Sequence, residues 1–146
     1  MVSLIQYLAN YAHALQPNFQ IWINSSGAED LLANSAFLNS INGAYEEELF
    51  YQDSVAPQSA AGTNYNLNLL NNLVAAGKPV SAIEYVTGEA TVTSVRAQAA
   101  AAGIGYYIAN PDLALNGVNT EGLNFPPLCF LPGTLIATPG GEVLVE

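Results

Sequence analysis

Basic residues are nearly absent from this chain. Lys78 and Arg96 stand against twelve acidic residues among 146, so the formal net charge at pH 7 is −10. A surface this acidic repels phosphate groups, which argues against nucleic-acid and membrane-surface partners. No apolar run reaches the length of a bilayer span. Residues 1–16 lack the basic start of a signal peptide, so we expect no signal peptide within this sequence.

Cysteine and histidine are equally scarce, with one of each, Cys129 and His13. A single cysteine excludes an internal disulfide, and one cysteine with one histidine excludes a Cys/His zinc cluster. The absence of a second histidine and of a G-x-S-x-G turn excludes a Ser-His-Asp triad. We therefore expect neither a metal nor another cofactor.

Apolar residues, in contrast, are abundant. They make up 51% of the chain, and the mean hydropathy is +0.25. This is enough material for one domain-sized core, and it excludes a disordered chain. The low share of charged residues, the two basic residues and the many asparagines are typical of an extracellular bacterial protein, so we expect a secreted protein.

Helix-like and strand-like segments alternate along the first part of the chain. Apolar strand-like runs begin near positions 19, 41, 80 and 104, and helical spacing of apolar residues lies before and between them. Ser26 and Glu29 have the spacing of a capping box for the helix after the first strand. The next helix is expected from Asn66 to Gly77, and the one after it to end at Gly103. Such alternation predicts an α/β fold with parallel βαβ crossovers. Four βα units are half of a (β/α)8 barrel, although they also suit a small open sheet. No glycine-rich turn follows a strand, which argues against dinucleotide binding.

The alternating pattern ends near residue 115. Glycine and proline in residues 116–127 indicate a linker. Residues 128–146 carry apolar runs on both sides of Pro139-Gly140-Gly141, which predicts a β-hairpin. We therefore expect a first domain over residues 1–115, a linker over 116–127 and the start of a second domain over 128–146.

Two glutamates stand where predicted strands end, Glu47 after the second strand and Glu84 after the third. The carboxyl ends of parallel strands form one edge, so these side chains are expected to approach each other. Glycoside hydrolysis uses such a pair of carboxylates. The alternative for Glu47 is a solvated loop residue. Glu84 lies within an apolar run, and a buried carboxylate needs a reason.

Aromatic and amide side chains follow the same strand ends. Tyr51 and Tyr85 suit stacking on sugar rings, with core packing as the alternative. Asn24 and Ser25 form the polar end of the first strand, and Asn110 ends the last one. We expect these five residues to contact a substrate.

Four segments of the chain resemble a known family. They are INSSGAEDLL (23–32), INGAYEEELFY (41–51), KPVSAIEYV (78–86) and AAAAGIGYYIANPDL (99–113). Together they resemble the carboxyl-terminal half of the endo-α-1,4-polygalactosaminidase-like glycoside hydrolases, family 114, over roughly residues 4–113. The resemblance implies a (β/α)8 barrel that acts on α-linked galactosamine polymers.

The same resemblance implies roles for individual residues. Glu47 matches the family's strand-six glutamate, a general acid/base, and Glu84 matches the acidic residue before the tyrosine of strand seven. Asn24 or Ser25 stands where the family has a Gln-Asn pair. The family's first half, with the strand-four aspartate expected to complete the catalytic pair, is absent from this sequence.

The last segment, CFLPGTLIATPGGEVLVE (129–146), is similar to the opening block of a Hint (hedgehog/intein) domain. In that family the first cysteine attacks the preceding carbonyl, because a thiolate is a good nucleophile. The resemblance implies this role for Cys129. The family's later Thr-x-x-His block is not in this sequence, so we expect Cys129 to be inert here.

Three functions follow as hypotheses. The first is a glycoside hydrolase fragment that cleaves an amino-sugar polysaccharide with Glu47 and Glu84, inactive by itself. The second is a non-catalytic carbohydrate-binding or adhesive module that uses the same rim. The third is a segment of a self-processing Hint precursor. A half barrel leaves strand edges uncovered, so we expect it to need the missing amino-terminal half or to self-associate.

Overall fold

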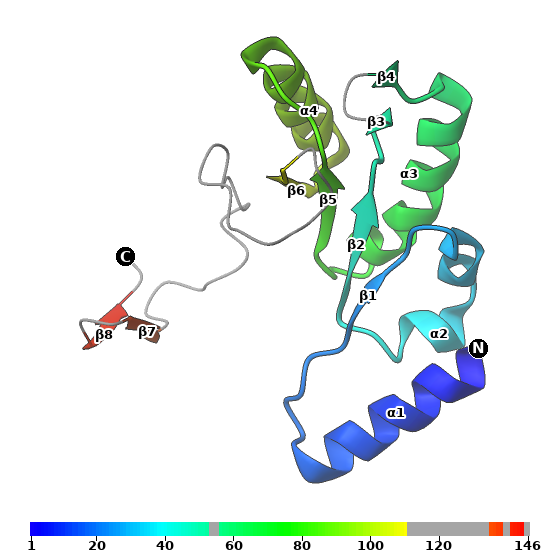
Figure 1. Ribbon diagram of the computed structural model, residues 1–146. Coiled ribbons are helices and arrows are strands. Elements are labelled where there is room, and N and C mark those ends of the chain that lie inside the picture. The colour runs from blue at the N-terminus through cyan, green and yellow to red at the C-terminus, as the bar shows by residue number, and fades with distance from the viewer. Residues whose placement is uncertain (53–55, 111–134, 139–140, 145–146) are drawn as a thin grey trace.

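A four-stranded parallel sheet forms the centre of the protein (Figure 1). The computed structural model describes residues 1–52, 56–110, 135–138 and 141–144. The strands follow one another across the sheet in chain order, and each neighbouring pair is parallel. They are β1 (Trp22–Asn24), β2 (Gly43–Glu47), β5 (Val80–Glu84) and β6 (Gly105–Ile108). The predicted α/β class is therefore confirmed.

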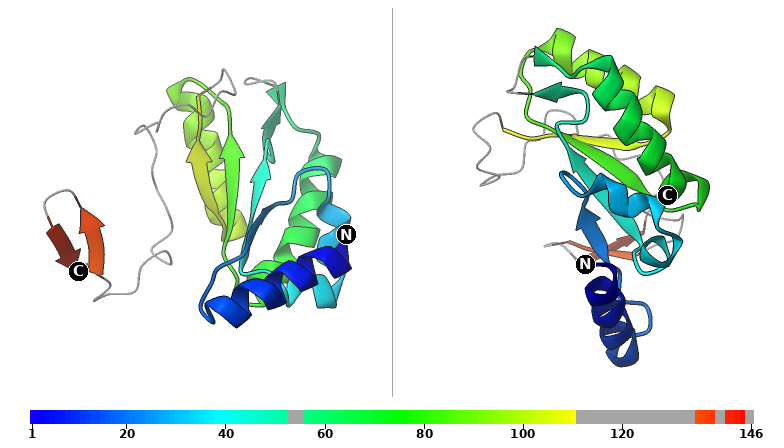
Figure 2. Two further views of the ribbon diagram at one scale, coloured as in Figure 1. Left: turned by 60° about the horizontal axis from the view of Figure 1, so that its bottom comes forward. Right: turned by 90° about the vertical axis from the view of Figure 1, so that its right-hand side faces the viewer.

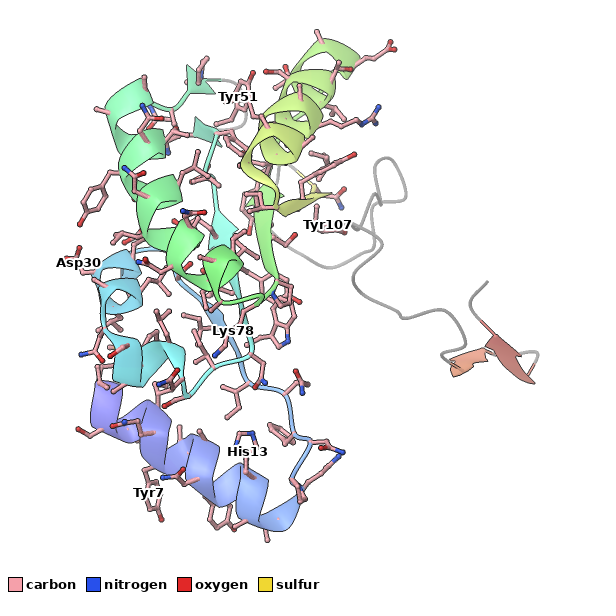
Figure 3. All side chains as sticks on the ribbon, turned by 180° about the vertical axis from the view of Figure 1, so that it is seen from behind. Tyr7, His13, Asp30, Tyr51, Lys78 and Tyr107 are labelled. Carbon is pink, nitrogen blue, oxygen red and sulfur yellow. The ribbon has the colours of Figure 1, made fainter. Side chains whose placement is uncertain are left out.

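Helices precede and connect these strands. They are α1 (Val2–Leu15), the 3-10 helix η1 (Glu29–Ala33), α2 (Ser35–Leu38), α3 (Ala60–Ala75) and α4 (Glu89–Ala102). Helices α3 and α4 lie side by side on one face of the sheet (Figures 2 and 3). Two short antiparallel strands, β3 (Tyr51–Gln52) and β4 (Ala56–Pro57), connect β2 to α3.

Alternation along the strands gives the sheet two different faces. The helix face is mostly apolar and is buried by α3, α4 and η1. Its core members on the strands and helices include Ala44, Val80, Ala82, Ile108, Leu32, Leu70, Leu73, Val95 and Ala99. We call the opposite side the open face. It carries Trp22, Asn24, Tyr45, Glu47, Ile83, Tyr85 and Tyr107, by strand register and alternation.

The segment after β1 differs from the helix that its sequence predicts. Ser26 and Glu29 have the spacing of a capping box, but each side chain is engaged elsewhere. The Ser26 hydroxyl accepts the Glu47 N–H, and the Glu29 carboxylate accepts the Gly27 N–H. The chain therefore forms the short η1, and the following α2 begins at a different cap, where Asn34 Oδ1 accepts the Phe37 N–H.

Helix α3 begins at Ala60, six residues before the expected start at Asn66. Its cap is Ser59, whose hydroxyl accepts the Gly62 N–H at 3.1 Å. The polar and small residues between Ala60 and Asn66 predict a loop from composition alone. The side-chain cap at Ser59 allows them to be helical. The predicted end is confirmed, because Gly77 follows the helix with φ +71°.

Helix α1 leaves most of its apolar side uncovered. Ala9 is buried, whereas Leu4, Leu8, Tyr11 and Leu15 are 47–71% exposed. Tyr7 also projects away from the rest of the chain (Figure 3). A groove of about 340 Å³ runs between α1 and the segment that leads into β1. Among the described residues, no helix is long and apolar enough to cross a membrane.

The carboxyl-terminal segment contains two antiparallel strands, β7 (Leu135–Thr138) and β8 (Gly141–Leu144). Thr138 pairs with Gly141. The predicted hairpin is therefore confirmed. Cys129, the linker and the boundary near residue 115 lie outside the described residues.

Candidate functional site

Glu47 ends β2 on the open face and is held by the turn that follows β1. The Asn24 amide donates to Glu47 Oε1 at 2.8 Å. The Glu47 N–H donates to Ser26 Oγ at 2.7 Å, and the Ser26 N–H donates to Asn24 Oδ1 at 3.1 Å. These three bonds close a ring that fixes the carboxylate relative to the backbone. Glu47 itself remains partly exposed.

Tyr85 lies beside the same carboxylate on the neighbouring strand. It comes directly after β5 and is 4% exposed. Burial raises the pKa of Tyr85, and the nearby charge of Glu47 raises the pKa further, so the phenol stays neutral. Glu47 is thus a carboxylate that the Asn24 amide holds beside a neutral phenol on the open face.

An aromatic pair lies on the open face beside this carboxylate. The rings of Trp22 and Tyr45 stack with centroids 4.9 Å apart and planes 30° apart. Gly43 makes room for this arrangement, because a Cβ there would lie 2.9 Å from the Trp22 ring. Tyr45 remains 38% exposed. Partly exposed aromatic faces beside a polar group provide a surface on which a sugar ring can stack.

Glu46 precedes Glu47 and therefore points to the opposite side, the helix face. It is 1% exposed. Its Oε2 lies 2.5 Å from Ser25 Oγ, and its Oε1 accepts from the Asn66 amide at 3.3 Å. Burial raises the pKa of Glu46 to about 7, opposed by the hydrogen bond to Ser25 and reinforced by the nearby Glu29 carboxylate.

Glu84 also points to the helix face and is completely buried. Its two oxygens accept the backbone N–H groups of Phe50 at 2.9 Å and of Tyr51 at 3.1 Å. Burial raises the pKa of Glu84 to about 7, although these backbone hydrogen bonds act in the opposite direction. The side chain anchors the loop after β2, where Glu48 adopts φ +53°.

Glu47 and Glu84 are therefore not brought together as the sequence predicted. Glu47 pairs in register with Ile83, so the next residue, Glu84, projects from the other face of the sheet. The physical reason is that successive residues of a strand point to opposite faces, so an odd difference in register between two residues places their side chains on different faces. Glu84 has a structural anchor role in the described residues, which answers why a carboxylate is buried there.

The other predicted residues divide between the two faces. Asn24 and Tyr85 lie with Glu47. Ser25 is buried with Glu46 on the helix face, and Tyr51 meets Glu84 through its backbone. Asn110 follows the end of β6, two strands away from β2.

Two residues with a clear part in the site were not predicted as site residues from the sequence. Ser26 receives the backbone N–H of Glu47, and Glu46 anchors Ser25. The signal for both was present, because Asn24-Ser25-Ser26 and Glu46-Glu47 alternate polar groups between the two faces. Assigning each of these residues to a face requires knowing the exact residue at which each strand ends.

Acidic residues occur where β2 and β5 end, at Glu46, Glu47, Glu48 and Glu84. Lys78 lies at the opposite end of the sheet from Tyr51 (Figure 3). The Tyr65 hydroxyl donates to the Asp30 carboxylate of η1. Within residues 1–52 and 56–110, no three His, Cys, Asp or Glu side chains are grouped to hold a metal ion. Neither a scan against protein-family models nor a search of curated proteins finds a match to this chain.

Proposed function

We propose that this chain is the carboxyl-terminal half of a (β/α)8-barrel glycoside hydrolase of the polygalactosaminidase-like type, with Glu47 as its acid/base residue. The observation that carries the proposal is the oriented carboxylate at the carboxyl edge of the sheet. Asn24 and Ser26 hold it beside Tyr85, on the face opposite α3 and α4. In parallel barrels, that edge is where active sites are built.

The strand order supports the half-barrel part of the proposal. Four parallel strands that follow one another in chain order, with α3 and α4 on one face, are the arrangement that successive strand–helix units of such a barrel produce. In this arrangement the open face lines the interior. The aromatic and amide groups beside Glu47 then point toward the barrel axis.

The charge distribution supports an amino-sugar substrate. A de-N-acetylated galactosamine polymer is cationic, and the chain carries a net charge of −10. Its acidic groups collect at the edge where Glu47 lies, so long-range attraction would favour a positively charged polymer over a neutral one.

One carboxylate is not enough for the proposed reaction. Hydrolysis of a glycosidic bond uses a second carboxylate as nucleophile or as the base that activates water. Glu84 is engaged on the helix face, and the open-face residues defined above include no carboxylate besides Glu47. Glu48, the next residue, lies near enough to Tyr85 for its charge to raise the pKa of that phenol. We therefore assign the second carboxylate to the other half of the barrel.

The test is hydrolysis by a polypeptide that contains this segment together with the first half of the barrel. Glu47→Gln is expected to abolish release of new reducing ends from a galactosamine polymer while leaving binding nearly intact. Glu89→Gln, at the exposed start of α4, is the matched control and should leave the rate unchanged. An unchanged rate in Glu47→Gln would refute the assignment.

A second candidate is a carbohydrate-binding module without chemistry, which the Trp22–Tyr45 pair favours. Here the polysaccharide stacks on the open face and Glu47 pairs with an amine of the sugar. Saturable binding of a soluble galactosamine polymer without new reducing ends over a long incubation distinguishes this function from hydrolysis.

Self-processing by a Hint domain stays a prediction, since Cys129 lies outside the described residues. Cleavage before Cys129, stimulated by added thiol in a longer polypeptide, is the result that this hypothesis predicts.

A further inference from the structure

The turn after β1 contacts the end of β2 on both faces of the sheet. Asn24 and Ser26 bind Glu47 on the open face, whereas Ser25, between them, binds Glu46 on the helix face. The two networks therefore share three consecutive residues. A change at Ser25 is therefore expected to displace Asn24 and Ser26, the groups that orient Glu47.

The contacts of Ser25 imply where a proton lies. Its hydroxyl is 2.9 Å from the Tyr45 carbonyl oxygen and 2.5 Å from Glu46 Oε2. A hydroxyl has one proton to donate, and a carbonyl oxygen can only accept. If Ser25 donates to Tyr45, the bond to Glu46 requires that Glu46 be the donor. Both contacts are satisfied when Glu46 is a neutral carboxylic acid.

The second oxygen of Glu46 agrees with this arrangement. Oε1 accepts from the Asn66 amide of α3, which a neutral carboxyl carbonyl can also do. The charged neighbours are Glu29 of η1 and Glu47 of the same strand, both acidic. The two basic side chains are bound elsewhere: Lys78 to the carbonyls of Leu38 and Ile41, and Arg96 to the Tyr106 hydroxyl.

We infer that Ser25 and Glu46 are positioning residues for Glu47, and that a proton held by Glu46 keeps the turn at residues 24–26 in place. When Glu46 loses this proton, the Ser25 hydroxyl must turn from the Tyr45 carbonyl to the new carboxylate. The Tyr45 carbonyl then keeps only the Ser25 N–H, at 2.8 Å. A buried negative charge also appears one residue from Glu47. The raised pKa of Glu46, about 7, places this change near neutral pH.

The inference rests on the proposed function only in treating Glu47 as the reactive group. The test needs no activity, because nuclear magnetic resonance reports the side-chain amide of Asn24, the backbone amide of Ser26 and the carboxyl carbons of Glu46 and Glu47. In the unmodified chain, we expect the Asn24 and Ser26 signals to shift together with the titration of Glu46, with a midpoint near pH 7.

Three variants complete the experiment. Glu46→Gln replaces the acid by a neutral group whose amide can donate to Ser25 while its oxygen accepts from Asn66, so the shift near pH 7 should disappear. Ser25→Ala should uncouple the Asn24 and Ser26 signals from the titration of Glu46. Glu89→Gln should titrate like the unmodified chain.

A Glu46 carboxyl that titrates below pH 5 would overturn the inference, as would an unchanged pH response in Glu46→Gln. The unmodified chain alone decides the first point, so the inference remains testable even if a variant fails to fold. Failure of the hydrolysis test with a normal titration would instead overturn only the proposed function.

Discussion

The two buried carboxyls make the stability of this protein depend on pH in an unusual direction. Burial raises the pKa of Glu46 and of Glu84 from 4.5 to about 7. In the unfolded chain each group releases its proton near pH 4.5, whereas in the folded chain it keeps the proton until about pH 7. The stabilisation is therefore fully present below pH 4.5 and is lost as the pH rises through about 7.

The size of this effect follows from the two pKa values. One pKa unit corresponds to about 1.4 kcal/mol, so each carboxyl contributes a decrease of about 3 kcal/mol in unfolding free energy between pH 4.5 and 7. A small domain has a total stability of about 5–15 kcal/mol. The change is thus large enough to measure by urea unfolding.

The decisive assay compares the unmodified chain with Glu46→Gln at several pH values from 4.5 to 8. Repulsion among the exposed acidic residues also changes with pH, but it changes alike in both proteins. The difference in unfolding free energy between them should therefore shift by about 3 kcal/mol in favour of Glu46→Gln as the pH rises. Parallel curves would show that Glu46 does not keep its proton to about pH 7 in the folded chain. Glu89→Gln, which alters an exposed group, should give such parallel curves.

Three further predictions concern packing. Gly43→Ala places a Cβ 2.8 Å from the Pro79 carbonyl oxygen, so urea unfolding should show a loss of about 1–3 kcal/mol, and full stability would contradict the contact. Asn34→Ala removes the cap of α2 and should cost about 1 kcal/mol in the same assay, whereas no loss would show that the cap is dispensable. The exposed side of α1 should drive self-association, seen by sedimentation as a mass that rises with concentration. The double change Leu8→Gln and Tyr11→Ser should reduce it, and a monomer at all concentrations would argue against an uncovered half barrel.

The sequence predicted the order and type of the main elements because their signals are local. Apolar runs marked the four strands, and Gly77 and Gly103 ended their helices as expected, both with positive φ. The beginnings of the helices were harder to predict. Ser26 and Glu29 had the spacing of a cap but bind β2 and the turn, which are tertiary contacts that no local pattern records.

The site was predicted in part for a similar reason. Glu47, Asn24 and Tyr85 were expected at one edge, and the structure brings them together. The partner expected for Glu47 was Glu84, which points to the helix face. Successive residues of a strand point to opposite faces, so an error of one residue in the strand phase exchanges an exposed carboxylate for a buried one.

The proposed function requires that the open face around Glu47 bind an amino sugar. A titration of this chain with galactosamine oligosaccharides, followed by nuclear magnetic resonance, measures that binding residue by residue. We predict saturable shifts at Glu47, the Asn24 amide, Tyr85 and the Trp22 indole, which weaken as salt is added. Shifts confined to the helix face or to α1, or no shifts at all, would contradict the claim.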